Sequence, residues 1–485
     1  MRSAEEATEY CNLLARAASA ADALSFDAKD ISCSVGYMEA QSKIIDVLIS
    51  AWRRDPHTIL AVLNKLICKI EAMENDKKRL YAVAICKWMD ENCSLDECKD
   101  DISFSLNALF PIASNQFMEF FTLNTNFVDI GIGVIPNFPT RIAYRKEEDT
   151  EPVRLANRDI FDGINGELNS IKLVPRIDGI DVRHILLMQT ISSNQAFRCA
   201  FSPLSDKKDL LEFERVKVVR GGREYDGISL QKIRYEAELQ QAFETQWRMA
   251  AEAGVHLFFA PEMLCTDMLA EEINGYNTVV RRLSRDMRKT GLPVPFLTIM
   301  PSHSRSGTNT VTILDQNGRV IGRQRKLYPF RDVHMHAIEA LTESPQHEII
   351  LIHLPGVHRI AILPCADLLT ESPDYAHKII CGKLGATLII TPSYSGGEQD
   401  FKSMLPTFTP YGTSVLWGNC CGASKSSPHT IGGIHIAGLE KTEWYGNVCQ
   451  CGGTCKRGMG CLFVADLPIR FTRNGPWDTH LHQLL

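Results

Sequence analysis

Gly254-Val-His-Leu-Phe-Phe-Ala-Pro-Glu262 is the stretch of sequence that decides the fold. Its apolar residues 255–259 have the length and composition of a buried strand, and they follow a segment, 230–253, with apolar residues at helical spacing. The strand ends at Pro261, so Glu262 stands just past its carboxyl end. Layered α/β folds expose catalytic groups at strand ends, and Glu262 is therefore a candidate catalytic residue.

Two further segments place a reactive side chain directly after an apolar strand. Lys326 follows a predicted strand at 319–324, and Cys365 follows a predicted strand at 359–363. The other elements expected in this region are helices at 275–289 and 374–384 and strands at 182–189, 294–300, 308–314 and 387–391. Strands that alternate with helices predict a layered α/β core with mixed sheets.

The order and the flanks of Glu262, Lys326 and Cys365 resemble those of the nitrilase superfamily of carbon–nitrogen hydrolases. The resemblance extends from about residue 182 to residue 470. It rests on the strand that ends at Gln189, on 254–262, on Asn309-Thr-Val-Thr-Ile-Leu-Asp-Gln-Asn-Gly-Arg-Val-Ile and on Gly385-Ala-Thr-Leu-Ile-Ile-Thr-Pro-Ser393. It implies a four-layer α-β-β-α sandwich with mixed sheets, and homodimers formed through helices of the outer layer.

Hydrolysis of an amide explains why these three residue types are needed. Cys365 is the expected nucleophile, but a free cysteine is mostly protonated at neutral pH and needs a base. Glu262 is the expected general base, and Lys326 would stabilise the oxygen that becomes anionic in the tetrahedral intermediate. The backbone N–H of Ala366 is the expected second donor to that oxygen.

Each of these residues also has a plain structural interpretation. A lone cysteine after Ile-Leu-Pro is more often a small buried hydrophobe, a lone strand-end lysine is usually solvated, and a glutamate after proline often caps a helix. Their joint appearance in this order favours catalysis over the three separate interpretations.

The surroundings of the three residues leave several roles open. Many members of the superfamily have a second glutamate shortly after the lysine, and here Asp332 and Glu339 are the candidates. Asp367, two residues after the cysteine, matches an acid that is frequent in the superfamily. Tyr394 and Ser395 follow the strand 387–391 and are placed in the substrate pocket by resemblance alone.

The expected substrate is a small molecule with an amide, carbamoyl or nitrile group. Lys326-Leu-Tyr-Pro329 resembles the true nitrilases, whereas Cys365-Ala-Asp367 resembles amidases and carbamoyl hydrolases, and we favour an amide. An N-acyltransferase would use the same triad with an amine in place of water. A further alternative is a binding or signalling module that keeps the fold as a scaffold.

The C-terminal region contains four cysteines within a short glycine-rich segment. Cys449, Cys451, Cys455 and Cys461 could bind Zn²⁺, but their spacing is not that of a standard zinc knuckle, and free thiols are favoured. His435 is expected to be a packed strand histidine rather than a substrate ligand. No metal and no organic cofactor are predicted.

The remaining features of the chain concern its organisation and compartment. Residues 1–115 are expected to form a helical bundle of unknown role, 116–181 a connector that contains a strand, and 182–485 the hydrolase domain. A net charge of −6 argues against nucleic-acid binding. The polar start of the chain, the absence of an 18-residue apolar run and the scattered cysteines predict a cytoplasmic protein without a membrane span.

Overall fold

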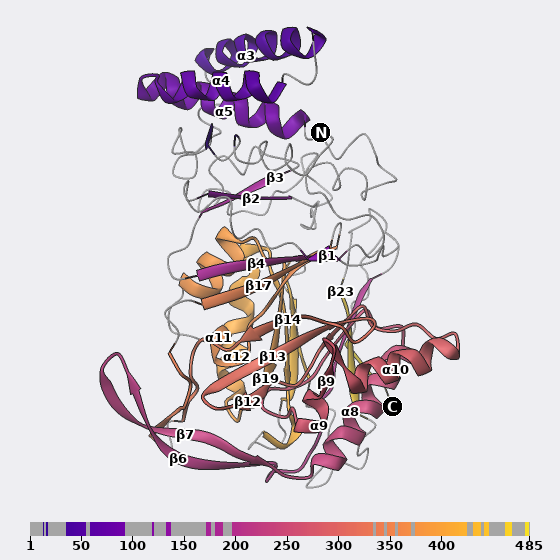
Figure 1. The fold of residues 1–485 in the computed structure, drawn as a ribbon. Coiled ribbons are helices and arrows are strands. Elements are labelled where there is room, and N and C mark those ends of the chain that lie inside the picture. Colours follow the sequence, from indigo (N-terminus) through magenta and orange to yellow (C-terminus); the bar gives the residue numbers. More distant parts are fainter. Residues whose placement is uncertain are drawn as a thin grey trace. The chain divides into compact units, whose positions relative to one another are not determined.

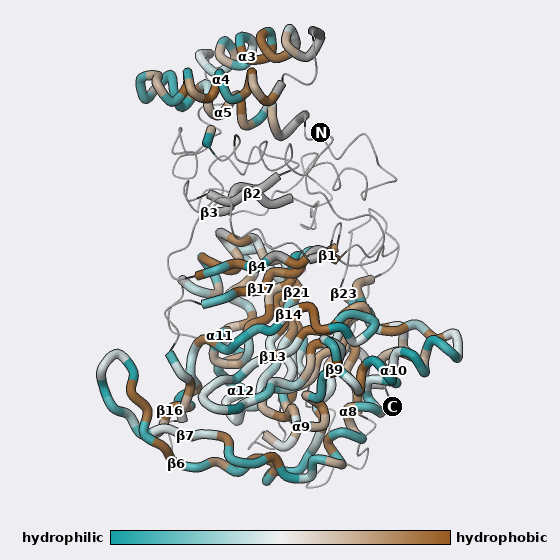
Figure 2. Tube along the Cα trace, in the orientation of Figure 1, coloured by the Kyte–Doolittle hydropathy of each residue, from teal (hydrophilic) through white to brown (hydrophobic). Residues whose placement is uncertain are grey.

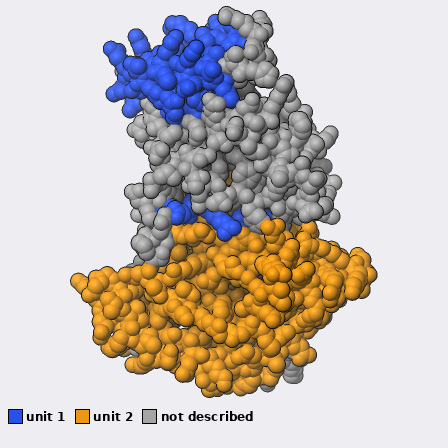
Figure 3. Space-filling model, viewed as in Figure 1, with its two compact units in different colours: residues 1–140, 156–188, 382–384 blue, residues 141–155, 189–381, 385–485 orange. Residues whose placement is uncertain are grey.

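The chain divides into two compact units in the computed structural model, and Figure 3 colours them separately. Unit 1 comprises residues 1–140, 156–188 and 382–384, and unit 2 comprises 141–155, 189–381 and 385–485. The structure describes residues 13, 16–17, 35–54, 59–92, 119–120, 132–136, 171–175, 180–187, 196–332, 336–343, 347–354, 357–369, 374–423, 430–437, 441–445, 461–467 and 481–484.

In the described part of unit 1 lie the helices α3 (Val35–Arg54), α4 (Ile59–Glu71) and α5 (Asn75–Asn92). Their buried side chains recur at helical spacing, as the sequence predicts, and they pack against one another. These side chains include Tyr37, Ile44, Leu48, Leu63, Ile67, Val83 and Cys86. The prediction of an N-terminal helical region is confirmed for these segments.

Unit 1 also contains two pairs of antiparallel strands. They are β1 (Glu119–Phe120) with β4 (Ile180–Leu186), and β2 (Ile132–Pro136) with β3 (Ile171–Pro175). No helix of the described part of the chain is long and apolar enough to cross a membrane.

The first sheet of unit 2 has eight strands of mixed direction. In spatial order they are β12 (His303–Arg305), β13 (Thr308–Asp315), β11 (Leu297–Ile299), β8 (Leu257–Phe259), β5 (Phe197–Phe201), β23 (Leu462–Leu467) and β24 (Leu481–Leu484), with β14 (Val320–Arg325) also paired to β13. The three central strands β11, β8 and β5 are parallel, so their carboxyl ends lie at one edge.

The second sheet of unit 2 is also mixed. Its strands within the unit run in the order β17 (His347–Leu354), β18 (His358–Ile362), β19 (Leu388–Ser393), β20 (Ser414–Asn419), β21 (Gly432–Ile436) and β22 (Lys441–Tyr445). Strands β18, β19 and β20 are parallel to one another. Each sheet thus brings the carboxyl ends of three strands to the same edge.

The two sheets pack face to face, and glycines allow the close approach. A Cβ on Gly418 of β20 would lie 2.7 Å from the Phe259 ring and 2.8 Å from the Phe201 ring. A Cβ on Gly432 of β21 would lie 2.5 Å from Phe201. Since Phe201 and Phe259 belong to the first sheet, the interior between the sheets is a packed apolar layer.

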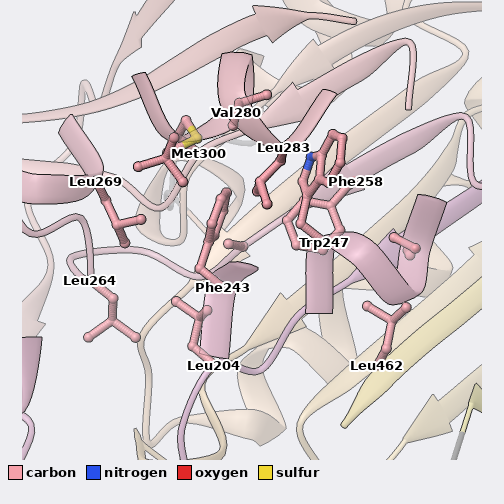
Figure 4. Close-up of a cluster of buried hydrophobic side chains, with 14 of the residues drawn as sticks. Leu204, Phe243, Trp247, Phe258, Leu264, Leu269, Val280, Leu283, Met300 and Leu462 are labelled. Carbon is pink, nitrogen blue, oxygen red and sulfur yellow. The ribbon is translucent and has the colours of Figure 1, made fainter. Parts of the chain in front are cut away.

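Helices cover the outer faces of both sheets. On the first sheet lie α8 (Glu236–Glu252) and α10 (Thr278–Lys289). Phe243 and Phe258 make an edge-to-face ring contact (Figure 4). Trp247 Nε1 donates a hydrogen bond to Thr298 Oγ1. On the second lie the π-helical segment η4 (Asp374–Lys383), α12 (Glu398–Met404) and the 3₁₀ segment η5 (Leu405–Tyr411). Phe401 of α12 stacks on Trp417, with centroids 4.5 Å apart. The predicted four-layer α-β-β-α order is confirmed.

Smaller elements complete unit 2 near the strand ends. They are α9 (Asp267–Ala270), β9 (Glu272–Ile273), β10 (Tyr276–Asn277), α11 (Ala366–Leu369) and η6 (Cys421–Ala423). A separate four-stranded sheet has the order β15 (Arg331–Asp332), β16 (Ala337–Glu339), β7 (Arg223–Ile233) and β6 (Leu211–Arg220). Figure 1 shows β6 and β7 as a long hairpin that extends away from the two large sheets.

Three local expectations differ from the structure. The helix expected from residue 230 begins at Glu236, because the preceding residues continue β7 and Tyr235 has a left-handed φ of 58°. The strand expected at 182–189 corresponds to β4, which falls in unit 1, and the first strand of unit 2 is β5. The helix expected at 374–384 forms as a π-helical segment.

Gly418→Ala is expected to lower the free energy of unfolding by about 1–3 kcal/mol, because its methyl group would meet two buried aromatic rings. Urea unfolding followed by tryptophan fluorescence measures this, since Trp247 and Trp417 are both buried in unit 2. Gly397→Ala is the matched control, because the atom nearest its Cβ is the carboxylate of the exposed Asp400, at 3.1 Å. Equal stability of the two variants would contradict the close-approach argument.

Candidate active site

Glu262 projects from the turn that follows β8. Backbone bonds hold this turn, since Ala260 N–H donates to Ile299 O and Met263 N–H donates to Ser302 Oγ at 2.7 Å. Met263 has a φ of 62°, a conformation that costs free energy in a residue other than glycine. The side chain of Glu262 is 1% exposed, so its carboxylate depends on protein groups for its hydrogen bonds.

Lys326 lies directly after β14 and its side chain is fully buried. Its backbone N–H donates to Asn309 O at 2.7 Å, which extends the pairing of β14 with β13 by one residue. Its Nζ lies 2.6 Å from Glu262 Oε1 and 2.6 Å from Glu339 Oε2. A buried ammonium needs such partners, because an uncompensated charge in the interior is strongly destabilising.

Cys365 occupies the sharp turn between β18 and α11. Its φ is 44°, and its N–H donates to Pro392 O at 3.0 Å, which ties the turn to β19. Its side chain is buried, and the carboxyl group of Glu262 is near enough to raise the pKa of the thiol. The structure therefore brings a sulfur, a carboxylate and an ammonium from distant parts of the chain into one cluster.

Asn309 links the two carboxylates of this cluster. Its Nδ2 donates to Glu262 Oε1 at 2.8 Å and to Glu339 Oε1 at 2.9 Å. Glu339 also accepts the backbone N–H of Phe330 at 3.1 Å. Of the two candidates for a second acid, Glu339 is thus placed against Lys326, whereas Asp332 lies in β15 with its side chain outside the described residues.

Asp367 connects the cysteine segment to the lysine segment. Its buried carboxylate accepts the backbone N–H groups of Leu327 at 3.0 Å and Tyr328 at 2.8 Å. Burial raises the pKa of Asp367 to about 8, and those N–H groups and the charge of Lys326 oppose the rise. The side chain therefore fixes the backbone next to Lys326 relative to the turn that carries Cys365. Ala366, between Cys365 and Asp367, is half-buried at the start of α11.

The charges of the cluster define its resting protonation. Burial raises the pKa of the Cys365 thiol well above its usual range, and the negative charge of Glu262 raises it further. Burial raises the pKa of Glu262 above 4.5, although the charge of Lys326 opposes this. Burial alone would lower the pKa of Lys326, but Glu262 and Glu339 raise it well above its usual range. The thiol is therefore neutral at rest, and Lys326 stays charged beside the carboxyl groups of Glu262 and Glu339.

A pocket of about 740 Å³ reaches this cluster. Its lining includes the carboxyl-bearing residues Glu262 and Glu339, together with Tyr394 and Ser395, which the sequence places there. The N–H of Tyr394 donates to Glu262 Oε2 at 3.4 Å, and the N–H of Ser395 donates to Asn419 Oδ1 at 2.9 Å. The end of β19 therefore forms part of the pocket wall and contacts the cluster.

Other sequence-derived candidates lie apart from this cluster or outside the described residues. Three of the cysteines in the C-terminal group, Cys449, Cys451 and Cys455, are outside them, and Cys461 is buried next to β23. Within the described ranges no group of three or more histidine, cysteine, aspartate or glutamate side chains is arranged to hold a metal ion. His435 contacts the hydroxyls of Thr409 and Thr442, each at 3.0 Å, and burial lowers its pKa to about 4.

Sequence reasoning missed two parts of the site. Asn309 entered the prediction only as the first residue of the stretch 309–321 that resembles the superfamily, whereas in β13 its side chain is turned inward and its amide donates to Glu262. The β6–β7 hairpin was not predicted, although Gly221-Gly222 between two segments with alternating polarity is a turn signal.

Comparisons with known proteins give a distant structural likeness. No family model and no curated protein match the chain. An amidase from Nesterenkonia sp. is 14% identical over 59% of this chain and 95% of its own, with a TM-score of 0.36. A second structure of that amidase, after removal of its histidine tag, is 15% identical over 56% and 93%, with a TM-score of 0.35. A variant described as an amidase from the nitrilase superfamily is 14% identical over 58% and 94%, with a TM-score of 0.37.

Lys326→Met is expected to reduce the free energy of unfolding by about 3–5 kcal/mol at neutral pH, because it leaves two buried carboxylates without their cation. The loss should shrink as the pH falls, since protonation removes the charges that the folded state no longer compensates. Urea unfolding of wild type and variant at several pH values measures both effects. The same substitution combined with Glu262→Gln and Glu339→Gln should recover part of the stability, and failure to do so would contradict the pairing.

Proposed function

We propose that this protein is a hydrolase that cleaves a non-peptide carbon–nitrogen bond of a small molecule through a thioester on Cys365. The observation that carries the proposal is the convergence of Cys365, Glu262 and Lys326 in one buried cluster, in which Lys326 Nζ lies 2.6 Å from Glu262 Oε1. These are the groups that thiol-based amide hydrolysis requires, and one of them, Glu262, lines a pocket large enough for a small molecule. An amide is the favoured substrate, with carbamoyl compounds and nitriles as the related alternatives.

In the first half-reaction, Glu262 takes the thiol proton while the sulfur bonds to the carbonyl carbon. The carbonyl oxygen becomes an anion, and Lys326 and the N–H of Ala366 stabilise it. Collapse of this intermediate breaks the carbon–nitrogen bond, and the proton on Glu262 passes to the departing nitrogen. Ammonia or an amine leaves, and a thioester remains on Cys365.

In the second half-reaction, Glu262 takes a proton from water and the resulting hydroxide bonds to the thioester carbon. Lys326 and the Ala366 N–H again stabilise the oxyanion. The carbon–sulfur bond then breaks, the thiolate regains its proton from Glu262, and the carboxylic acid leaves. Glu262 thus returns to its starting state after each half-reaction.

Glu339 and Asn309 act as positioning residues in this proposal. Glu339 holds Lys326 Nζ together with Glu262, and Asn309 donates to both carboxylates and so links them. The pair of carboxylates also keeps the cluster's net charge negative, which disfavours a free thiolate. Proton transfer from Cys365 to Glu262 leaves that net charge unchanged, so the nucleophile is generated without adding charge to the buried site.

Cys365→Ala should reduce amide hydrolysis at least about a thousandfold, because it removes the nucleophile. Ammonia release measured across short amides, carbamoyl amino acids, nitriles and glutamine tests activity and substrate group together. Cys68→Ser is the matched control, because Cys68 is an exposed cysteine of unit 1.

Mass spectrometry of the wild type quenched with acid during turnover should detect an acyl group on the peptide that contains Cys365. Hydrolysis that persists in Cys365→Ala, or an acyl group found on another residue, would refute the assignment. Acyl transfer to an added amine in preference to water would identify an N-acyltransferase.

The pH profile of kcat/KM should fall on the acid side with a midpoint above 4.5. The sign follows because Glu262 must be ionised to accept the thiol proton, and burial raises its pKa in the folded protein. Initial rates between pH 4 and 9, with tryptophan fluorescence to verify that the protein stays folded, give the midpoint. A midpoint below 4.5 would exclude Glu262 as the base.

A further inference from the structure

The β6–β7 hairpin has two chemically different faces. Phe213 and Leu230 are direct cross-strand partners in its register, and side chains two residues apart on a strand point to the same face. Next to the pocket, the face that contains them carries Leu211, Phe213, Ile228 and Leu230, whereas Glu212 and Glu214 alternate with these on β6. Farther along β6 the same face continues with the charged residues Arg215 and Lys217. Figure 2 shows hydrophobic and hydrophilic segments along both strands.

The apolar face of the hairpin forms one wall of the pocket that reaches Glu262. All four of its residues, Leu211, Phe213, Ile228 and Leu230, line that pocket. Phe213 is 39% exposed, so its ring is accessible from the pocket that it lines. The hairpin therefore presents an apolar surface to the space in which a substrate would bind.

The hairpin is tied directly to the catalytic cluster. Strand β7 pairs with β16 in parallel, with Ile228 opposite Glu339, and Ala340 N–H donates to Ile228 O at 2.8 Å. Glu339 in turn contacts Lys326. The apolar wall thus has a fixed position relative to the group that holds the ammonium.

The remainder of the pocket is apolar near the cluster and charged at its exposed positions. Its other apolar lining residues are Met263, Phe330, Ala340, Leu341, Leu369, Tyr394 and Ala423, and its serines are Ser229, Ser304 and Ser395. Its charged lining residues outside the cluster, Lys208, Arg305, Arg331 and Asp400, are all exposed. Arg305 pairs with Asp267, which reduces its availability for a ligand. The inner surface therefore favours an uncharged apolar group.

We propose that the β6–β7 hairpin selects substrates by their acyl chain, so that the preferred substrate is an amide of an apolar acid several carbons long. The chain would lie against Phe213 and Leu230, with the amide carbon at Cys365. This inference rests on the proposed function. It excludes short polar amides such as glutamine as preferred substrates, because their polar ends would face an apolar wall.

A chain-length series tests the inference. For acetamide, butyramide and hexanamide, kcat/KM of the wild type should rise about fourfold per methylene, as expected for burial of a CH₂ group. Succinamic acid, a charged amide close in length to butyramide, should be the poorer of those two. Phe213→Ser should lower the ratio of kcat/KM for hexanamide to that for acetamide about tenfold or more.

Val219→Ser is the matched control, because Val219 is a 65% exposed residue of the same strand that does not line the pocket. It should leave the hexanamide-to-acetamide ratio unchanged. Circular dichroism establishes that both variants keep their fold. A flat or falling series in the wild type, or equal ratios in Phe213→Ser and Val219→Ser, would overturn the inference while leaving the hydrolase assignment intact.

Calorimetric binding to Cys365→Ala separates the inference from the proposed function. Hexanamide should bind this variant more tightly than acetamide, and adding Phe213→Ser should remove the difference. That result would support the apolar subsite even if the wild type released no ammonia, which would refute the hydrolase assignment alone. Equal binding of the two amides would overturn the subsite.

Discussion

The candidate active site depends on the contacts of the buried Lys326 ammonium with Glu262 and Glu339. An ion of this kind is tolerated in the interior only when opposite charges and hydrogen bonds compensate its loss of water. Glu262 and Glu339 provide this compensation at 2.6 Å each, and Asn309 fixes the two carboxylates. The segments that follow β8 and β14 and the last residue of β16 therefore meet in one cluster.

The layered architecture makes this convergence possible. Glu262 follows a parallel strand of the first sheet and Cys365 follows a parallel strand of the second, and the two sheets pack face to face. Asp367 accepts hydrogen bonds from the backbone just after Lys326, so the turn that carries Cys365 is held against the segment that carries Lys326. The small sheet of β6, β7, β15 and β16 adds Glu339 from a third direction. Four separate parts of the chain thus define one cluster.

Much of this arrangement could be predicted from the sequence, for a definite physical reason. Glu262, Lys326 and Cys365 each follow a short apolar strand, and a strand end is recognisable from local composition. The position of Glu339 could not be predicted with equal certainty, because it depends on which strand pairs with β16. Asp332 is nearer to Lys326 in sequence, but pairing with β7 places Glu339 at the cluster.

Strand β5 and the β6–β7 hairpin illustrate the same limit. Phe197–Phe201 is a short buried run without alternation, which periodicity cannot distinguish from other apolar segments. The hairpin has a recognisable glycine turn, but the sequence does not indicate that its apolar residues line the pocket. Local patterns therefore predict elements and strand-end residues, whereas partners set by pairing between distant strands require the three-dimensional structure.

The backbone is strained at the two turns that carry Met263 and Cys365. Cys365 and Met263 both have left-handed φ values, which cost about 1–3 kcal/mol each in residues other than glycine. Each is held by a backbone N–H bond, to Pro392 O and to Ser302 Oγ respectively. The tight turns bring the cysteine sulfur and the Glu262 carboxylate together at adjoining strand ends. Because backbone hydrogen bonds fix both turns, the positions of the Cys365 thiol and the Glu262 carboxyl group are set by the fold.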